Sequence, residues 1–189
     1  MTRNRKKILM MVALMMAAFL AAGAQRSEAQ SGFLAPIKTQ WESTRALVTN
    51  MADFVPEDKY DWKPTPEVRS FREQLQHLVG ENYMYMSMAA GETNPMGNDK
   101  INALKTRAEI VQAMKDSYEY GAKVWAGMTE AKAMENITLF NNQAPRLRAI
   151  LGQIVDNMDH YGNLVVYVRV NGMVPPRSAP RAPATPAPR

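Results

Sequence analysis

The chain contains no cysteine among its 189 residues. It therefore has no disulfide, no thiolate ligand for a metal ion, no thiol nucleophile and no cysteine for an N-terminal lipid anchor. Histidine is almost as scarce, with two residues in the whole sequence. Any chemistry that uses an imidazole must therefore depend on His77 and His160.

An excess of basic residues is also missing from the central part of the chain. The formal net charge is +5, but five basic residues lie in residues 1–30 and three lie in residues 177–189. Without these ends, 15 of the 23 basic residues remain against 17 of the 18 acidic residues. Because binding to nucleic acid depends on many contacts that neutralise phosphates, we expect no nucleic-acid partner.

Residues 1–29 have the pattern of a secretory signal peptide. Four basic residues precede an apolar run from Ile8 to Ala22, and small residues follow it. This order is typical of a signal peptide, with cleavage after Ala24 or Ala29. The apolar run is shorter than the roughly 20 residues that span a membrane, so we expect no stable membrane insertion after cleavage. The sequence therefore predicts an exported protein, either periplasmic or secreted.

The other end of the chain is rich in proline. Residues 175–189 read PPRSAPRAPATPAPR and have no apolar periodicity. Such a segment buries too little surface to offset the entropy lost on ordering, so we expect a disordered tail here. Residues 31–174 remain, which is the usual size of one domain with one core.

Four segments between these ends have the apolar periodicity of amphipathic helices. They cover residues 35–55, 70–91, 106–128 and 147–171. Ser70 and Thr106 are each followed three residues later by glutamate, which is the capping-box pattern that begins a helix. Helices with one apolar face must bury that face against each other. The sequence therefore predicts an all-α fold, a four-helix bundle.

One short segment differs from the helical pattern. Residues 137–140 read ITLF and could form an extended piece in the third connection. Four residues are too few to support a sheet. The predicted fold class therefore contains no sheet.

The candidate site combines both histidines with one acidic residue. Asp156 lies one turn before His160, so the two side chains share one face of the last helix. His77 in the second helix completes a set of two histidines and one carboxylate, which leaves positions on a bound ion for water or substrate. All three residues lie off the centres of the apolar faces, where a cleft between helices could open. In the alternative interpretation, both histidines are ordinary surface or capping groups, and Asp156 simply hydrogen-bonds to His160.

Two segments of the chain resemble the DinB-like (damage-inducible protein) superfamily of four-helix bundles. They are the turn and helix YDWKPTPEVRSFREQLQHLVGEN and the last helix with DNMDHYGNLVVYVRVNGMVPP. The resemblance covers roughly residues 33–176. It implies a metal site formed by one histidine of the second helix and two histidines of the last helix, spaced four apart. His77 and His160 match two of these positions, whereas Asp156 stands where the family usually has histidine.

The aspartate at position 156 leaves two alternatives. A carboxylate also ligates divalent metals, so the site can hold a Zn, Ni, Mn or Fe ion with harder ligand character. Otherwise, the substitution marks a domain that has lost its metal. The resemblance further implies either thiol-dependent transferase or isomerase activity or metal-dependent hydrolysis, and it implies pairing as a homodimer.

Among these activities, export favours hydrolysis over thiol transfer, because it removes the protein from the thiol pool of the cytoplasm. A bound divalent ion makes water acidic enough to attack an electrophile, here in a small-molecule substrate of unknown identity. Glu81 and Asp159 are the candidate catalytic residues for proton transfer, although acidic residues on helix surfaces are usually just solvated. Two other functions stay open: a non-catalytic bundle that binds a ligand or partner, and a thiol-dependent transferase.

Overall fold

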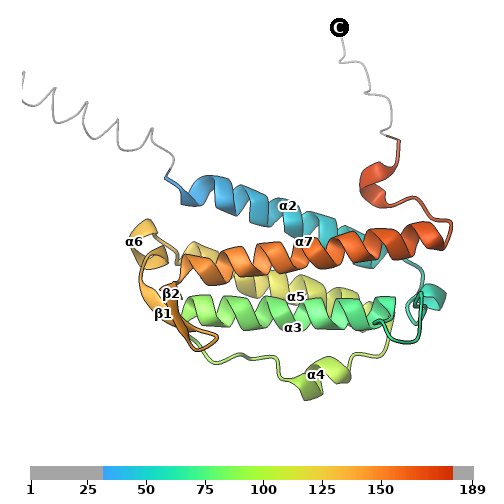
Figure 1. The fold of residues 1–189 in the computed structure, drawn as a ribbon, viewed down its shortest axis with the longest axis horizontal. Coiled ribbons are helices and arrows are strands. Elements are labelled where there is room, and N and C mark those ends of the chain that lie inside the picture. The colour runs from blue at the N-terminus through green and yellow to red at the C-terminus, as the bar shows by residue number, and fades with distance from the viewer. Residues whose placement is uncertain (1–31, 181–189) are drawn as a thin grey trace, which may run out of the picture. The chain divides into compact units, whose positions relative to one another are not determined.

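The computed structural model describes residues 32–180, so the predicted signal peptide at 1–29 and residues 181–189 lie outside the described part. The described part contains six α-helices and one two-stranded sheet. Four helices are long and run alongside one another in Figure 1: α2 (Leu34–Phe54), α3 (Phe71–Ala90), α5 (Arg107–Ala126) and α7 (Leu147–Val170). These are the segments that the apolar periodicity predicts. None of the described helices is apolar over enough of its length to cross a membrane.

Shorter elements lie in the connections between the long helices. They are the 3-10 turn η1 (Glu57–Lys59), the helices α4 (Asn98–Asn102) and α6 (Glu130–Ala133), the strands β1 (Asn136–Leu139) and β2 (Asn142–Pro145), and the 3-10 turn η2 (Pro176–Ser178). The turn η2 falls at the start of the predicted proline-rich tail. The last nine residues of that tail are outside the described range.

Hydrogen bonds at the helix ends explain where α3 and α5 begin. The hydroxyl of Ser70 accepts from the N–H of Glu73 at 3.2 Å, and the Glu73 carboxylate accepts from the N–H of Ser70 at 2.6 Å. Thr106 and Glu109 form the same pair of bonds at the start of α5. Both predicted capping boxes are therefore confirmed. The capping box at Ser70 fixes where α3 begins and therefore the position of His77 along the helix axis.

Aromatic side chains of α2 and α5 pack at the centre of the core. Trp41 is fully buried, and its ring centroid lies 5.6 Å from that of Tyr118 and 6.2 Å from that of Trp125. A Cβ atom added to Gly121 would come within 2.8 Å of the Trp41 indole. Glycine at this position therefore lets the indole lie directly against the backbone of α5, where large aromatic groups contribute much of the buried area.

Buried hydrogen bonds join α3, α5 and α7 beside this core. Asn82 of α3 donates to Ser117 of α5 at 2.9 Å and accepts from Gln153 of α7 at 2.6 Å. Tyr118 of α5 donates to Asn157 of α7 at 2.7 Å. Because a buried polar group without a partner is costly, these bonds favour one register of the three helices. Gln153 and Asn157 lie within one turn of the candidate aspartate, so the same bonds fix its level in α7.

The segment before α7 is a β-hairpin, which corrects the prediction that residues 137–140 are too few to support a sheet. β1 pairs antiparallel with β2, and Leu139 lies opposite Asn142 at the closed end. The turn residues Phe140 and Asn141 have positive φ values of 48° and 66°, as a tight two-residue hairpin requires. The described fold is therefore mostly helical rather than all-α.

Candidate metal centre

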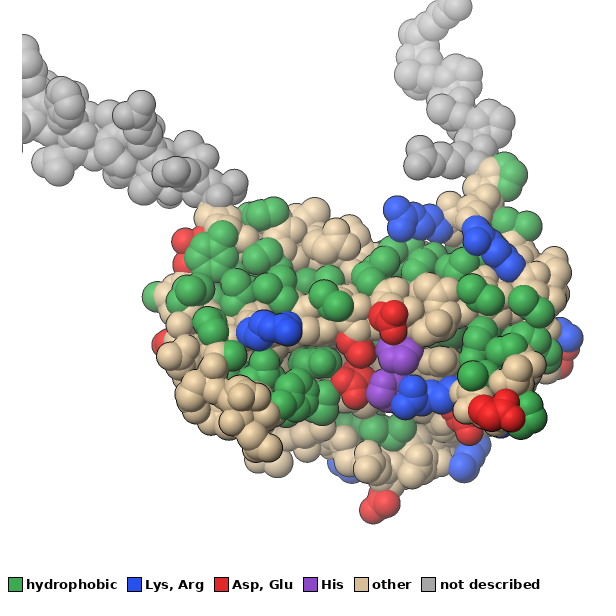
Figure 2. Space-filling model, in the orientation of Figure 1, with side chains coloured by type: hydrophobic (Ala, Val, Ile, Leu, Met, Phe, Trp, Pro, Cys, Tyr) green, Lys and Arg blue, Asp and Glu red, His purple; other side chains and the backbone are tan. Residues whose placement is uncertain are grey.

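His77 of α3 comes together with Asp156 and His160 of α7. One ligand atom from each residue lies within 4.8 Å of those of the other two. The imidazole rings are 4.7 Å apart between centroids and meet edge to face at 71°. Figure 2 shows the two histidines side by side on one face, with acidic side chains on one side of them and basic ones on the other. The three residues that the spacing singled out are therefore neighbours in space.

Gln74 of α3 orients the ring of His160. Its side-chain oxygen lies 2.7 Å from Nδ1 of His160 in a buried hydrogen bond. An amide oxygen can only accept, so Nδ1 of the neutral ring carries the proton and Nε2 keeps a free lone pair. Nε2 lies 3.8 Å from Oδ1 of Asp156. Histidine ligands of metal ions are held in the same way, by a hydrogen bond to the nitrogen that does not bind the metal.

Asp156 has a carboxylate oxygen that lacks a partner. Its Oδ2 is buried and makes no hydrogen bond among the described residues. Its Oδ1 lies 3.8 Å from Nε2 of His160, beyond hydrogen-bond distance. Burial raises the pKa of Asp156, while the charge of His160 lowers it and that of Asp159 raises it. Because an unpaired buried carboxylate is unfavourable, a cation at this point would satisfy the free oxygen.

His77 is held in its uncharged form. Burial is the largest cause that lowers the pKa of His77 to about 4, followed by the positive charge of Arg69 and by the repulsion that His160 adds when it is protonated. At neutral pH the imidazole is therefore neutral, which is the form that binds a metal ion. Its Nδ1 lies 3.9 Å from Oε1 of Glu81, so no hydrogen bond ties the ring to that carboxylate.

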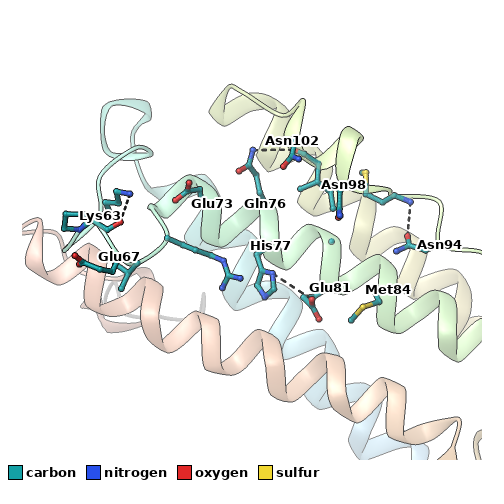
Figure 3. A pocket seen from close by; sticks show the side chains of 16 residues that line it. Lys63, Glu67, Glu73, Gln76, His77, Glu81, Met84, Asn94, Asn98 and Asn102 are labelled. Carbon is teal, nitrogen blue, oxygen red and sulfur yellow. Dashed lines mark hydrogen bonds and ion pairs between the residues drawn. The ribbon is translucent and has the colours of Figure 1, made fainter. Parts of the chain in front are cut away.

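The two candidate proton-transfer residues differ in their distance from the histidines. Glu81 lies one turn after His77 and points into the same cleft, as Figure 3 shows. The pKa of Glu81 is raised, first by burial and then by the charge of Asp156. Asp159 is exposed on α7 and makes no hydrogen bond or ion pair with any described residue. Of the two candidates, only Glu81 therefore adjoins the cleft, and Asp159 acts on the site only through its charge.

The spacing of the three residues fits a small divalent cation. Ligand bonds to such ions are about 2.0–2.2 Å long, so two ligand atoms of one ion lie at most about 4.4 Å apart. The distance from His160 Nε2 to Asp156 Oδ1 is within this limit, at 3.8 Å. The whole set extends to 4.8 Å. Side-chain movements of roughly 0.4 Å would bring all three ligand atoms into range.

A cleft of about 540 Å³ opens beside His77 and Glu81. It is bounded by α3, by the connection that precedes α3 and by the segment around α4 (Figure 3). Gly80 lets the α4 segment approach α3 closely, because an added Cβ would come within 2.8 Å of Ile101. The volume is that of a pocket for a small molecule. The candidate metal site therefore adjoins a space that can hold a substrate or ligand.

Two residues that act on this cluster, Gln74 and Arg69, are not among those that the sequence pattern predicts. Gln74 lies three residues before His77 and so shares a face of α3 with it; this spacing is the signal that could have found it. Arg69 immediately precedes the N-cap of α3, in a connection whose path no periodicity predicts. Its position near the histidines becomes visible only in three dimensions.

These features define a mostly helical protein with a cluster of histidines and a carboxylate between two of its long helices. A family model described as the DinB superfamily matches residues 37–164. The chain belongs to the DinB superfamily, which confirms the resemblance noted in its sequence. No match was found among curated proteins.

Two solved structures of DinB-like proteins have the same fold. The protein from Bacillus subtilis is 19% identical, with a TM-score of 0.61 over 74% of this chain and 93% of its own. The protein from Bacillus cereus is 14% identical, with a TM-score of 0.65 over the same shares of the two chains. At such identities the similarity extends to the fold alone. The shared fold therefore does not assign a function to the chain.

Proposed function

We propose that the protein binds one divalent metal ion through His77, Asp156 and His160. The observation that carries this proposal is the convergence of three ligand atoms within 4.8 Å of one another. Two features of the neighbourhood support it. Gln74 leaves Nε2 of His160 free to ligate, and Oδ2 of Asp156 is buried without a partner.

The donor set indicates which ions the site would hold. Two imidazole nitrogens and one carboxylate oxygen suit Zn, Ni, Mn and Fe. The set contains no thiolate, since the chain has no cysteine, and this disfavours ions that prefer sulfur. Three protein ligands leave coordination positions open, which is typical of catalytic rather than structural sites.

We infer that the reaction, if the ion is catalytic, is hydrolysis of a small molecule bound in the adjoining cleft. A divalent ion supplies acidity to water and polarises an electrophile. In this scheme Glu81 holds or accepts a proton, because its carboxylate adjoins His77 and lines the cleft. The cleft residues would bind and orient the substrate. A non-catalytic protein that binds a ligand in the same cleft is the second candidate, favoured by the aspartate that stands where the family usually has histidine.

Metal analysis of protein purified without a histidine tag tests the proposal. We expect about one ion per chain after loading with Zn, Ni, Mn or Fe, and loss of that ion in His77→Ala, His160→Ala and Asp156→Ala. Asp159→Ala is the matched control, since it removes an exposed acid from the same helix and should keep the ion. Wild-type protein that binds no metal under any loading condition would overturn the proposal.

Hydrolysis is tested separately with metal-loaded protein and a panel of esters, amides and phosphate monoesters. Activity that disappears in His77→Ala and drops sharply in Glu81→Gln, with metal retained in Glu81→Gln, supports the hydrolase. Stoichiometric metal with no turnover of any class, together with ligand binding in the cleft, supports the non-catalytic alternative.

We also propose that the protein acts outside the cytoplasm, as a periplasmic or secreted protein. The support is the order of charged, apolar and small residues at 1–29, which lie outside the described residues. Mass spectrometry of the mature protein is expected to find a first residue of Gln25 or Gln30. An intact first segment in a cytoplasmic fraction would contradict export.

A further inference from the structure

The cleft beside the candidate metal site contains charged groups that differ in how strongly they are held. Lys63 donates to the backbone oxygen of Pro66 at 3.1 Å, and Glu73 is held in the capping box of α3. Figure 3 shows Lys63 turned back toward its own loop. Arg69 also lines the cleft, and its exposed guanidinium makes no hydrogen bond or ion pair with any described residue.

Half of the arginines in the described part of the chain have a carboxylate partner, and Arg69 belongs to the half without one. Arg72 pairs with Asp61 at 2.6 Å, and Arg146 pairs with Glu135 at 3.1 Å. Arg45 also has a carboxylate partner. What distinguishes Arg69 from the other unpaired arginines is its place in the wall of this cleft. Its N–H donors have no partner among the described residues and are therefore available to a ligand.

The backbone of Arg69, in contrast, is firmly anchored. Its carbonyl oxygen accepts a 2.7 Å hydrogen bond from the hydroxyl of Tyr167 on α7, and Tyr167 is 6% exposed. The following residue, Ser70, is the buried N-cap of α3. The Cα of Arg69 is therefore fixed between α3 and α7, while the charged end of its side chain is unconstrained. An anchored backbone with an unpaired guanidinium places a binding group at a defined point of the cleft.

The charge of Arg69 reaches the candidate ligands. Arg69, His77 and Glu81 line the same cleft, and the positive charge of Arg69 acts on His77, Glu81 and Asp156 alike. All three groups therefore lie within its electrostatic range, although it bonds to none of them. The cleft volume of about 540 Å³ limits a ligand that contacts both His77 and this guanidinium to a small molecule.

The opposite wall of the cleft supplies uncharged polar groups. Asn98 and Asn102, one turn apart, line it from α4, and Figure 3 shows both on the side facing α3. Their amides donate and accept hydrogen bonds equally well. A molecule with hydroxyl or amide groups fits this wall better than an apolar one.

We propose that Arg69 binds the anionic group of a small polar substrate, a carboxylate or a phosphate, beside the metal ion. This inference rests on the proposed function, because it names the substrate class of the same site. The planar guanidinium donates two parallel hydrogen bonds to either group. Arg69 is thus a specificity-determining residue: it selects anionic over neutral substrates and turns the reacting part of the molecule toward His77 and Glu81.

Binding of three probes of similar size tests the inference. Benzoate and phenyl phosphate carry the two anionic groups, and benzyl alcohol is the neutral analogue. Calorimetry or ligand-observed NMR on metal-loaded wild type is expected to show one or both anions binding at least about tenfold more tightly than the alcohol. The stronger of the two anions identifies the group that the site prefers.

Three variants complete the design. Arg69→Ala should lose the preference for anions, Arg69→Lys should keep part of it because lysine retains the charge but not the planar fork, and Arg169→Ala should behave as wild type. Arg169 is an exposed arginine of α7 that does not line the cleft. Equal anion affinity in wild type and Arg69→Ala, or no anion preference in wild type, would overturn the inference.

The failure of this inference and that of the metal site are distinguishable. Metal content is measured on every variant, and Arg69→Ala should retain the ion. If wild type holds no metal, the proposed function fails, whereas loss of benzoate or phenyl phosphate binding in Arg69→Ala alone still supports the anion site. If metal is bound and Arg69→Ala binds anions as wild type does, only the inference fails.

Discussion

The side-chain oxygen of Gln74 lies 2.7 Å from Nδ1 of His160, a buried hydrogen bond that joins α3 to α7. We expect Gln74→Ala to weaken metal binding roughly 10–100-fold, because the bond fixes the orientation and protonation of the ligating ring. Competition with a chromophoric chelator measures this affinity. Gln76→Ala is the matched control: Gln76 lies on the same helix but bonds to the backbone of Leu104. Equal affinities in both variants would contradict the role of Gln74.

The replacement Asp156→His should change which metal the site prefers. It converts the set into three imidazoles, which are softer ligands than a carboxylate. We expect affinity for Zn and Ni to rise about tenfold or more relative to Mn. Competition titrations on wild type, Asp156→His and Asp159→His measure the preference. A preference that shifts equally in both variants, or in neither, would show that position 156 is not a ligand.

The protonation of His77 should make the metal-free protein less stable in acid. Its pKa is near 6.5 in an unfolded chain and about 4 in the folded protein. Between these values the unfolded chain binds a proton that the folded protein excludes, so the free energy of unfolding falls as the pH falls from about 6.5 to about 4. Asp156 and Glu81 contribute with the opposite sign, since burial raises the pKa of each.

Comparison of wild type with His77→Gln isolates the contribution of this one residue. We expect wild type to lose stability relative to the variant over this pH range, as measured by urea unfolding in the presence of a chelator. A stability difference that stays constant from pH 7 to pH 4 would show that His77 is not held neutral by the fold.

Gly121 in α5 should not tolerate even a methyl group. A Cβ there would lie 2.8 Å from the buried Trp41 indole, and overpacking a core of this kind costs about 1–3 kcal/mol. Most of this range exceeds the gain of roughly 1 kcal/mol in helix propensity. Gly121→Ala is therefore expected to lower the free energy of unfolding. In Gly162→Ala nothing lies within 4 Å of the new Cβ, so the same substitution should stabilise α7; urea unfolding compares the two.

The helices and the Asp156–His160 pair were predictable because local rules determine them, whereas the place of His77 in the cluster came from the family resemblance and the scarcity of histidine. Each capping box lies within four residues of sequence, so Ser70 and Glu73 identify the start of α3 without knowledge of the rest of the fold. The pair Asp156 and His160 follows from the period of one helix. Rotation counting placed His160 away from the apolar face, yet it is 8% exposed. The reason is Gln74, which meets the ring from the neighbouring helix.

The rest depends on contacts between distant segments. The hairpin turn needs a positive φ at Phe140, which is unusual for a bulky residue; the ring packs edge-on against Tyr85 of α3, 5.7 Å away. The cleft exists because the segment around α4 lies against α3, and the sequence does not encode that path in any period. The position of Arg69 depends on the hydrogen bond from Tyr167 to its backbone oxygen, which joins residues 98 positions apart in the sequence.

The residues proposed to bind the metal and the residues proposed to bind the substrate lie on different kinds of element. The groups that would grip a cation stand on regular helices cross-linked by buried bonds, whereas Arg69, Asn98 and Asn102 belong to a connection or to a five-residue helix within one. Randomising those three positions alone could therefore change which compounds the protein binds while leaving the proposed metal ligands in place. In nature, the equivalent would be paralogues that share the three candidate ligands and differ in the connections that contain Arg69, Asn98 and Asn102.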